Sequence, residues 1–97
     1  VWPWLMGPFI TAFIKVKNHE LTWREFAFQN FLQPMFNVFG DRWDGSIYEI
    51  FDAEPPYLPR GCITQAWSVA EILRCWVEDI ENIMPKYKDV FLHKIRV

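Results

Sequence analysis

A long apolar stripe in the second half of the chain constrains its fold more than any other feature. Between Thr64 and Met84, apolar side chains recur every three or four positions, a spacing typical of an amphipathic α-helix. Pro85 is expected to end the segment, because proline has no N–H for the helical hydrogen bond. We therefore predict a helix over residues 64–84. Its inner face would comprise Ala66, Trp67, Ala70, Leu73, Val77, Ile80 and Met84.

Two more helices are predicted in the first part of the chain. Residues 3–17 are apolar on nearly every face, which is typical of a helix buried on more than one side. Thr22 and Glu25 have the spacing of a capping box at the start of the next helix. The short link predicts an antiparallel helical hairpin over residues 3–39. Its inner faces would comprise Leu5, Phe9, Ala12, Phe13 and Val16 in the first helix, and Phe28, Phe31, Leu32, Met35 and Phe39 in the second.

The segment over residues 41–61 is irregular. Ser46 to Phe51 alternates like a short strand, and prolines after it favour open conformations. A loop this long in a compact helical protein is either functional or disordered, and the aromatic content argues against disorder. We therefore predict an all-α fold with about three main helices. The long loop over residues 41–61 would contain the active site, and residues 85–97 would form a tail.

Aromatic side chains are too numerous for a chain of this size to bury. The 97 residues include six Trp and nine Phe, whereas a small domain has too much surface for its volume to hide so many large rings. Part of this apolar area must face a partner, a ligand or further sequence. We interpret the chain as a piece of a longer polypeptide, and we expect self-association through an exposed apolar face if it stands alone.

Charge and cysteine content exclude several classes of function. The net charge of −2, without a basic stripe, argues against nucleic acid as a partner. The uncharged run over residues 1–14 is shorter than the roughly 20 residues that span a membrane. Cys62 and Cys75 flank one predicted helix, roughly 20 Å apart along it, so we expect free thiols in a cytoplasmic protein. The sequence has no Cys/His cluster of the zinc-binding kind, and we expect no metal and no other cofactor.

Glu49 is the candidate catalytic residue. A carboxylate in a turn-rich loop is usually a solvated charge, but its neighbours Ile50 and Phe51 would bury part of this segment and make an idle carboxylate costly. Arg60 and Gln65 supply hydrogen-bond donors for hydroxyl groups. Flat aromatic rings of the kind that stack on sugars accompany them, so the combination is typical of a carbohydrate site. These rings belong to Trp2, Trp4, Trp43, Tyr57 and Trp67.

The order of motifs resembles one enzyme family along nearly the whole chain. The motifs are VWPWLMGPF at 1–9, SIYEIFD at 46–52, RGC at 60–62 and QAWSVAEIL at 65–73. They resemble the C-terminal amylo-α-1,6-glucosidase domain of archaeal and bacterial glycogen-debranching enzymes, and more distantly the glucoamylases. The resemblance implies the C-terminal portion of an (α/α)6 toroid, an α-glucan substrate such as glycogen or limit dextrin, and inverting hydrolysis. It makes Glu49 the general base that activates water.

The resemblance also implies that the general acid lies upstream of this chain. Four acidic neighbours of Glu49 do not match the family's acid; they are Asp41, Asp44, Asp52 and Glu54. We therefore hypothesise that the isolated chain is inactive, because the leaving oxygen would lack its proton donor. The residues expected to bind substrate are Trp2, Trp4, Arg60, Gln65 and Trp67. Trp67 also lies on the predicted inner face of its helix, where core packing is the alternative role.

Two other interpretations remain open. The chain is alternatively a non-catalytic helical module that binds a glycan or a protein, in which Glu49 serves only the structure. A generic helical hairpin protein explains the periodicities but not the ordered set of motifs. The interpretations differ in whether Glu49 points into a concave, aromatic-lined space with room for water.

Overall fold

A computed structural model describes residues 1–39 and 45–83 of the chain, and in this part the fold is helical. A 3₁₀ turn, η1 (Pro3–Leu5), leads into helix α1 (Met6–Val16). The second helix combines α2 (Leu21–Ala27), the π-helical η2 (Phe28–Leu32) and α3 (Gln33–Phe39). The third combines α4 (Ala66–Arg74) with the π-helical η4 (Cys75–Ile80). The predicted all-α class is confirmed, and the predicted residues Trp43, Met84 and 85–97 lie outside the described part.

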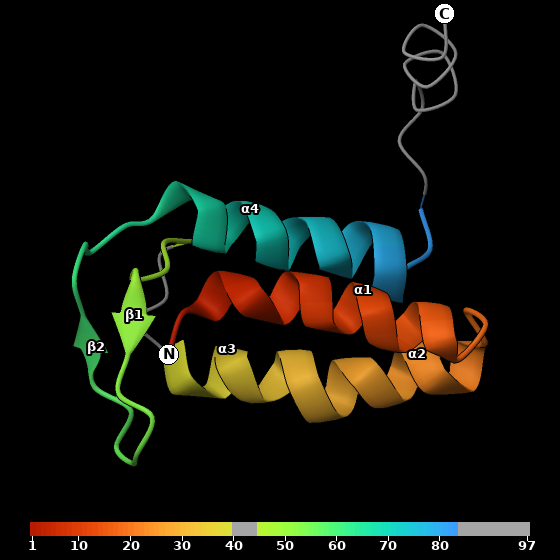
Figure 1. The fold of residues 1–97 in the computed structure, drawn as a ribbon, viewed down its shortest axis with the longest axis horizontal. Helices are drawn as coiled ribbons and strands as arrows, with labels where there is room; N and C mark the ends of the chain where they lie inside the picture. The colour runs from red at the N-terminus through yellow and green to blue at the C-terminus, as the bar shows by residue number, and fades with distance from the viewer. Residues whose placement is uncertain (40–44, 84–97) are drawn as a thin grey trace, which may run out of the picture.

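Helix α1 lies between the other two long helices, as Figure 1 shows. The turn after it contains Asn18 and His19, both with φ of 56°, and it reverses the chain so that α2 returns antiparallel to α1. The predicted helical hairpin is therefore present. The core between the three helices consists of Ile10, Ile14, Ala27, Leu32, Ile47, Ile72, Cys75 and Ile80.

The inner face of the second helix was predicted correctly as far as its side chains are described, which excludes Phe39, whereas the inner faces of the other two helices were predicted only in part. In the second helix Leu32 is buried, and Phe28, Phe31 and Met35 pack against the core as predicted. In α1, however, Leu5, Phe9 and Val16 are exposed, and the buried side chains are those of Ile10 and Ile14. The third helix exposes Trp67, Leu73 and Val77 and buries Ser68, Ile72, Cys75, Asp79 and Ile80. Of the residues predicted for these two faces, Phe13 packs against the core and Ile80 is buried in it. Both helices have apolar residues on two faces, so apolar spacing alone did not identify most of the buried residues.

The helix ends also differ from the sequence prediction. The capping box is absent, because α2 begins at Leu21 and Thr22 lies inside its first turn. Glu20 precedes the helix, and its carbonyl accepts hydrogen bonds from the N–H groups of Trp23 and Arg24. The third helix ends at Ile80, before Pro85, since Asn82 adopts a left-handed conformation with φ of 56° and terminates it.

Pro34 stands inside the second helix without ending it. Proline offers no N–H to the carbonyl four residues back, and its ring crowds that carbonyl. The five residues of η2 just before α3 adopt the wider π-helical form, which loosens the helix where the proline ring needs room. The long helix therefore continues across Pro34.

The predicted long loop contains a short β-ribbon at one end of the helices, and the predicted extended segment over residues 46–51 includes its first strand. Strand β1 (Ile50–Phe51) pairs antiparallel with β2 (Pro59–Arg60), with Ile50 opposite Arg60. On its other edge, the Phe51 N–H donates to the Val1 carbonyl (2.8 Å), and the Val1 nitrogen donates to the Phe51 carbonyl (2.6 Å). Ile47, which is 1% exposed, anchors the ribbon in the helical core. Strand β1 is thus paired on both of its edges, and Ile47 anchors the ribbon in the core.

Candidate active site on the β-ribbon

Glu49 lies where the β-ribbon departs from a regular ladder. The pairing of Ile50 with Arg60 would place the Tyr48 N–H opposite the Cys62 carbonyl, but the Glu49 N–H donates to that carbonyl instead (2.9 Å). One extra residue, Gly61, is therefore inserted after β2, which is a β-bulge. Bulges of this kind redirect side chains and are frequent beside active sites. The Tyr48 ring lies 6.2 Å from the Phe51 ring, measured between ring centroids.

The Glu49 carboxylate is oriented by the opposite strand. The Cys62 N–H donates to Glu49 Oε2 over 3.1 Å, and the side chain is partly buried. Among the residues that the structure describes, no side chain forms an ion pair with this carboxylate. One oxygen is held by the backbone while the other remains available, which is the arrangement that a base for a water molecule requires.

Gly61 makes this close approach possible. Its φ is +73°, a left-handed conformation that favours glycine. A Cβ atom added to Gly61 would lie 2.9 Å from Glu49 Oε2 and 3.2 Å from Glu49 Cβ. The ribbon therefore needs glycine at this position both for its backbone conformation and to leave room for the carboxylate.

Arg60 pairs with Asp52 rather than with Glu49. Its Nε and Nη2 atoms donate to the two carboxylate oxygens of Asp52 at 2.6 and 3.0 Å. The hydrogen bond from Arg60 lowers the pKa of Asp52 below its usual value, and the same contact raises the pKa of Arg60. The pair lies on the surface and closes the hairpin between β1 and β2.

Three of the predicted sugar-binding residues meet in one aromatic cluster. The Trp67 ring lies 5.7 Å from the Trp2 ring and 5.6 Å from the Trp4 ring, all in tilted contact. Trp67 is 44% exposed and Trp2 41%, whereas Trp4 is less exposed and its buried Nε1 has no hydrogen-bond acceptor in the described part of the chain. Trp2 and Trp67 thus offer exposed ring surface, and Trp4 packs against the Trp67 ring.

Gln65 connects the ribbon to the third helix. Its N–H donates to the Ile47 carbonyl over 2.8 Å, and it precedes α4 without making a side-chain cap. This hydrogen bond places Trp67, two residues later, beside the N-terminal residues. Gln65 is positioned by its backbone, and its side chain is partly buried.

Next to the ribbon, a hollow of about 380 Å³ opens between the N-terminal residues and the hairpin. We call it the apolar hollow. Its walls come from η1, α1, α3 and the hairpin, and they include Trp2, Phe51, Asp52 and Tyr57. Glu49 is not among its lining residues. Of the aromatic rings predicted for a carbohydrate site, those of Trp2 and Tyr57 line this hollow.

Residues 1–74 match the family described as amylo-alpha-1,6-glucosidase. The chain belongs to this family. The match covers the N-terminal tryptophans, the ribbon and α4, and it confirms the predicted resemblance to the C-terminal domain of glycogen-debranching enzymes. No curated protein and no solved structure matches the chain.

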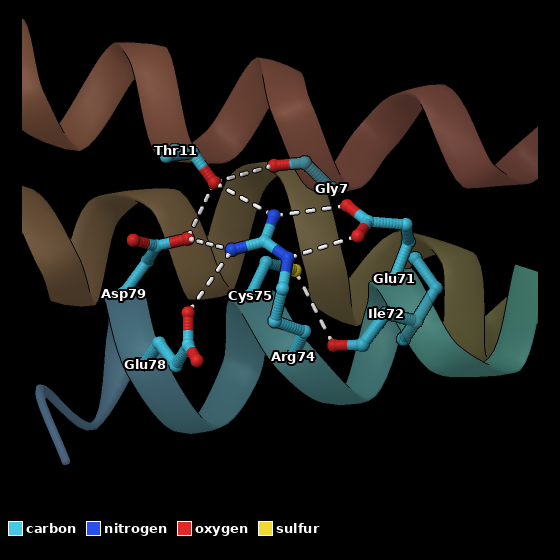
Figure 2. A network of polar contacts seen from close by, with 8 residues as sticks. All are labelled: Gly7, Thr11, Glu71, Ile72, Arg74, Cys75, Glu78 and Asp79. Carbon is cyan, nitrogen blue, oxygen red and sulfur yellow. Dashed lines mark hydrogen bonds and ion pairs between the residues drawn. The ribbon is translucent and has the colours of Figure 1, made fainter. Parts of the chain in front are cut away.

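The match to the glucosidase family ends at Arg74, which is the centre of a polar network between α4 and α1 (Figure 2). Arg74 donates to both carboxylate oxygens of Glu71 at 2.9 Å and to the Thr11 hydroxyl at 2.9 Å. Thr11 in turn donates to the buried Asp79 carboxylate over 2.6 Å. These bonds lower the pKa of Glu71 and raise that of Arg74. The network fixes α4 against α1 and so positions Trp67.

Sequence reasoning missed the partners that shape this glucosidase-family site. Asp52 holds Arg60, the Cys62 N–H holds the Glu49 carboxylate, and Gly61 leaves it room. The Gly61 position had a readable signal, since an isolated glycine beside a strand often marks a bulge or a close backbone approach. The other two depend on pairing across the ribbon, which no local pattern reveals.

Two further findings concern metals and membranes. Over residues 1–39 and 45–83, no group of three His, Cys, Asp or Glu side chains could hold a metal ion. No helix in that same part is long and apolar enough to cross a membrane.

Cys62 and Cys75 are free thiols, as predicted.

Proposed function

We propose that this chain carries the general base of an inverting α-1,6-glucosidase that acts on an α-glucan, and that Glu49 is this base. The observation that carries the proposal is the Glu49 carboxylate, which is held through one oxygen by the Cys62 N–H on a bulged ribbon. In inverting hydrolysis, such a carboxylate removes a proton from water as the water attacks the anomeric carbon. Membership of the amylo-alpha-1,6-glucosidase family supports this reaction.

The proposal assigns roles to the other predicted residues. Trp2 and Trp67 stack on sugar rings, which is supported by their exposed tilted rings, and Trp4 packs beneath them. Arg60 and Gln65 bind sugar hydroxyls, Arg60 with the donors that Asp52 leaves unused. The proposal includes the wider assignment that the chain forms the C-terminal portion of an (α/α)6 toroid in a cytoplasmic enzyme.

The general acid lies outside this chain in the proposed mechanism, so the isolated chain does not hydrolyse a branched glucan. A sugar leaving group needs protonation, and no acidic residue here matches that role. The base can still be tested alone with α-D-glucosyl fluoride, because fluoride departs as an anion without first receiving a proton. Attack by water then gives β-glucose and releases fluoride, and Glu49 takes up the proton from the water.

The experiment compares fluoride release by the wild-type chain, Glu49→Gln and the control Glu54→Gln. Glu54 lies exposed in the hairpin of the same ribbon and is not assigned a role. We expect Glu49→Gln to lose about 100-fold in rate or more, as general base removal typically does, and Glu54→Gln to keep the wild-type rate. Limit dextrin should release no glucose with any variant. Equal fluoride release by wild type and Glu49→Gln would refute the assignment of the base.

A second candidate function is a non-catalytic module that binds a partner through apolar surface. It is favoured by the outward face of the third helix, where Trp67, Leu73 and Val77 are all exposed. Such a face seldom remains uncovered in a soluble monomer. Sedimentation of the isolated chain, together with the fluoride assay, distinguishes the two functions. A monomeric chain whose fluoride release depends on Glu49 supports only the enzyme segment. Self-association without such release supports the binding module.

A further inference from the structure

The ladder of the β-ribbon is too short to fix its own register. Each strand has two residues, and Pro59 in β2 has no N–H to donate to the ladder. Gly61, the extra residue of the bulge, follows directly with φ of +73°. Register is weakly specified in strands of this kind. A further contact is therefore needed to keep the bulge between Arg60 and Cys62.

The ion pair of Asp52 with Arg60 spans this ladder diagonally. Arg60 lies opposite Ile50, and Asp52 stands two residues after Ile50, a separation that long side chains bridge across a ladder. Hydrogen bonds of 2.6 and 3.0 Å join the guanidinium to both carboxylate oxygens. Because a bidentate pair fixes direction as well as distance, it holds Arg60 in one position relative to β1.

The residues after Arg60 hold the Glu49 carboxylate. The Cys62 carbonyl accepts a hydrogen bond from the Glu49 N–H over 2.9 Å, while the Cys62 N–H donates to Glu49 Oε2 over 3.1 Å. In a ladder without the bulge, Cys62 would stand opposite Tyr48. A shift of one position would thus separate the carboxylate from its donor.

The effect of this ion pair is local. The Arg60 side chain is 59% exposed and that of Asp52 35%, and exposed ion pairs contribute little to overall stability. The pair joins the two strands directly beside the bulge. We therefore expect its loss to change the position of the bulge without unfolding the helical core.

We propose that Asp52 is a positioning residue for the base: its ion pair with Arg60 holds the bulge at Gly61 in register, so that the Cys62 N–H stays on the Glu49 carboxylate. The inference rests on the proposed function, because it takes the role of Glu49 from it. It gives Asp52 a role that neither the motifs nor the family match provides.

The test is amide hydrogen exchange at the Cys62 N–H, followed by NMR in the 97-residue chain. Glu49→Ala removes the acceptor and defines the exchange rate without the hydrogen bond. In Asp52→Asn, which removes the charge at constant size, we expect Cys62 to exchange about fivefold faster than in wild type, the upper range for an exposed ion pair. Glu54→Gln, an exposed position in the same hairpin, should exchange like wild type. The urea transition should be the same in Asp52→Asn and wild type.

Charge reversal distinguishes an electrostatic contact from lost packing. Asp52→Arg brings two cations together and should raise the Cys62 exchange rate further. Adding Arg60→Asp to that variant recreates the pair in reverse and should restore the wild-type rate. Salt tests the same contact without a substitution. At about 1 M sodium chloride, exposed charges are screened, so Cys62 exchange should rise in wild type and stay constant in Asp52→Asn.

An unchanged Cys62 exchange rate in Asp52→Asn, or a reversed pair that does not restore it, would overturn the inference. In the fluoride assay, Asp52→Asn should lower kcat and leave KM unchanged, because the base acts in the transition state. An unchanged kcat despite faster exchange would contradict the positioning role. Exchange requires no substrate, so the two proposals fail separately. If Cys62 responds but fluoride release does not depend on Glu49, only the proposed function is wrong.

Discussion

Replacing Gly61 by alanine tests whether the ribbon is built around the Glu49 carboxylate. At φ of +73°, an L-residue costs about 1–2 kcal/mol relative to a right-handed conformation. The new Cβ would lie 2.9 Å from Glu49 Oε2, and displacing a packed neighbour adds about 1–3 kcal/mol. We therefore expect Gly61→Ala to lower the free energy of unfolding by about 2–5 kcal/mol.

Gly45 provides a matched control for this experiment. Its φ is +92°, but a Cβ added there would meet no atom within 4 Å. Gly45→Ala should therefore lose only the conformational part, about 1–2 kcal/mol. Urea denaturation followed by circular dichroism measures both losses, and their difference reports the contact with Glu49.

A double-mutant cycle and the fluoride assay complete the test. Glu49→Ala removes the Oε2 and Cδ atoms that the new Cβ would approach, so the cost of Gly61→Ala should fall toward that of Gly45→Ala in this background. In the assay, Gly61→Ala should lose at least about tenfold in rate, because the base is displaced. If both glycine variants lose the same stability, the reasoning about the Glu49 contact is wrong.

Three further predictions concern the helices. Gly7→Ala should destabilise by about 1–3 kcal/mol, because its Cβ would collide with the Glu71 side chain across the α1–α4 contact; thermal melting measures this. Arg74 lowers the pKa of Glu71, so the stability from this pair is fully present above the ordinary glutamate pKa of 4.5 and is lost as pH falls from there through the lowered pKa; Arg74→Met should flatten that acid slope in urea titrations. Cys62 should react rapidly with iodoacetamide, and Cys75 only after unfolding, because burial raises its pKa to about 12.

The existence of the helices could be predicted from sequence, but their orientation about their own axes could not. Apolar spacing identified the third helix, yet it chose the face of Trp67 and Leu73, which is exposed. The buried face contains Asp79, and a buried carboxylate is costly unless it is paired. Thr11, which is 68 residues away in sequence, provides that partner. Periodicity within one helix contains no information about such a contact.

The candidate site was likewise predictable from the sequence only in part. The motif around Glu49 and the tryptophans near both ends of the matched segment could be read from the sequence, and the three tryptophan rings do meet. The bulge at Gly61 and the pairing of Arg60 with Asp52 depend on register across the ribbon. A shift of one residue would send every side chain to the other side, and a single sequence does not specify that register.

The pairing of Val1 with Phe51 joins two segments that are fifty residues apart. Because Trp2 follows Val1 directly and β1 begins one residue after Glu49, the same two backbone hydrogen bonds help to fix where the first tryptophan and the carboxylate stand relative to each other.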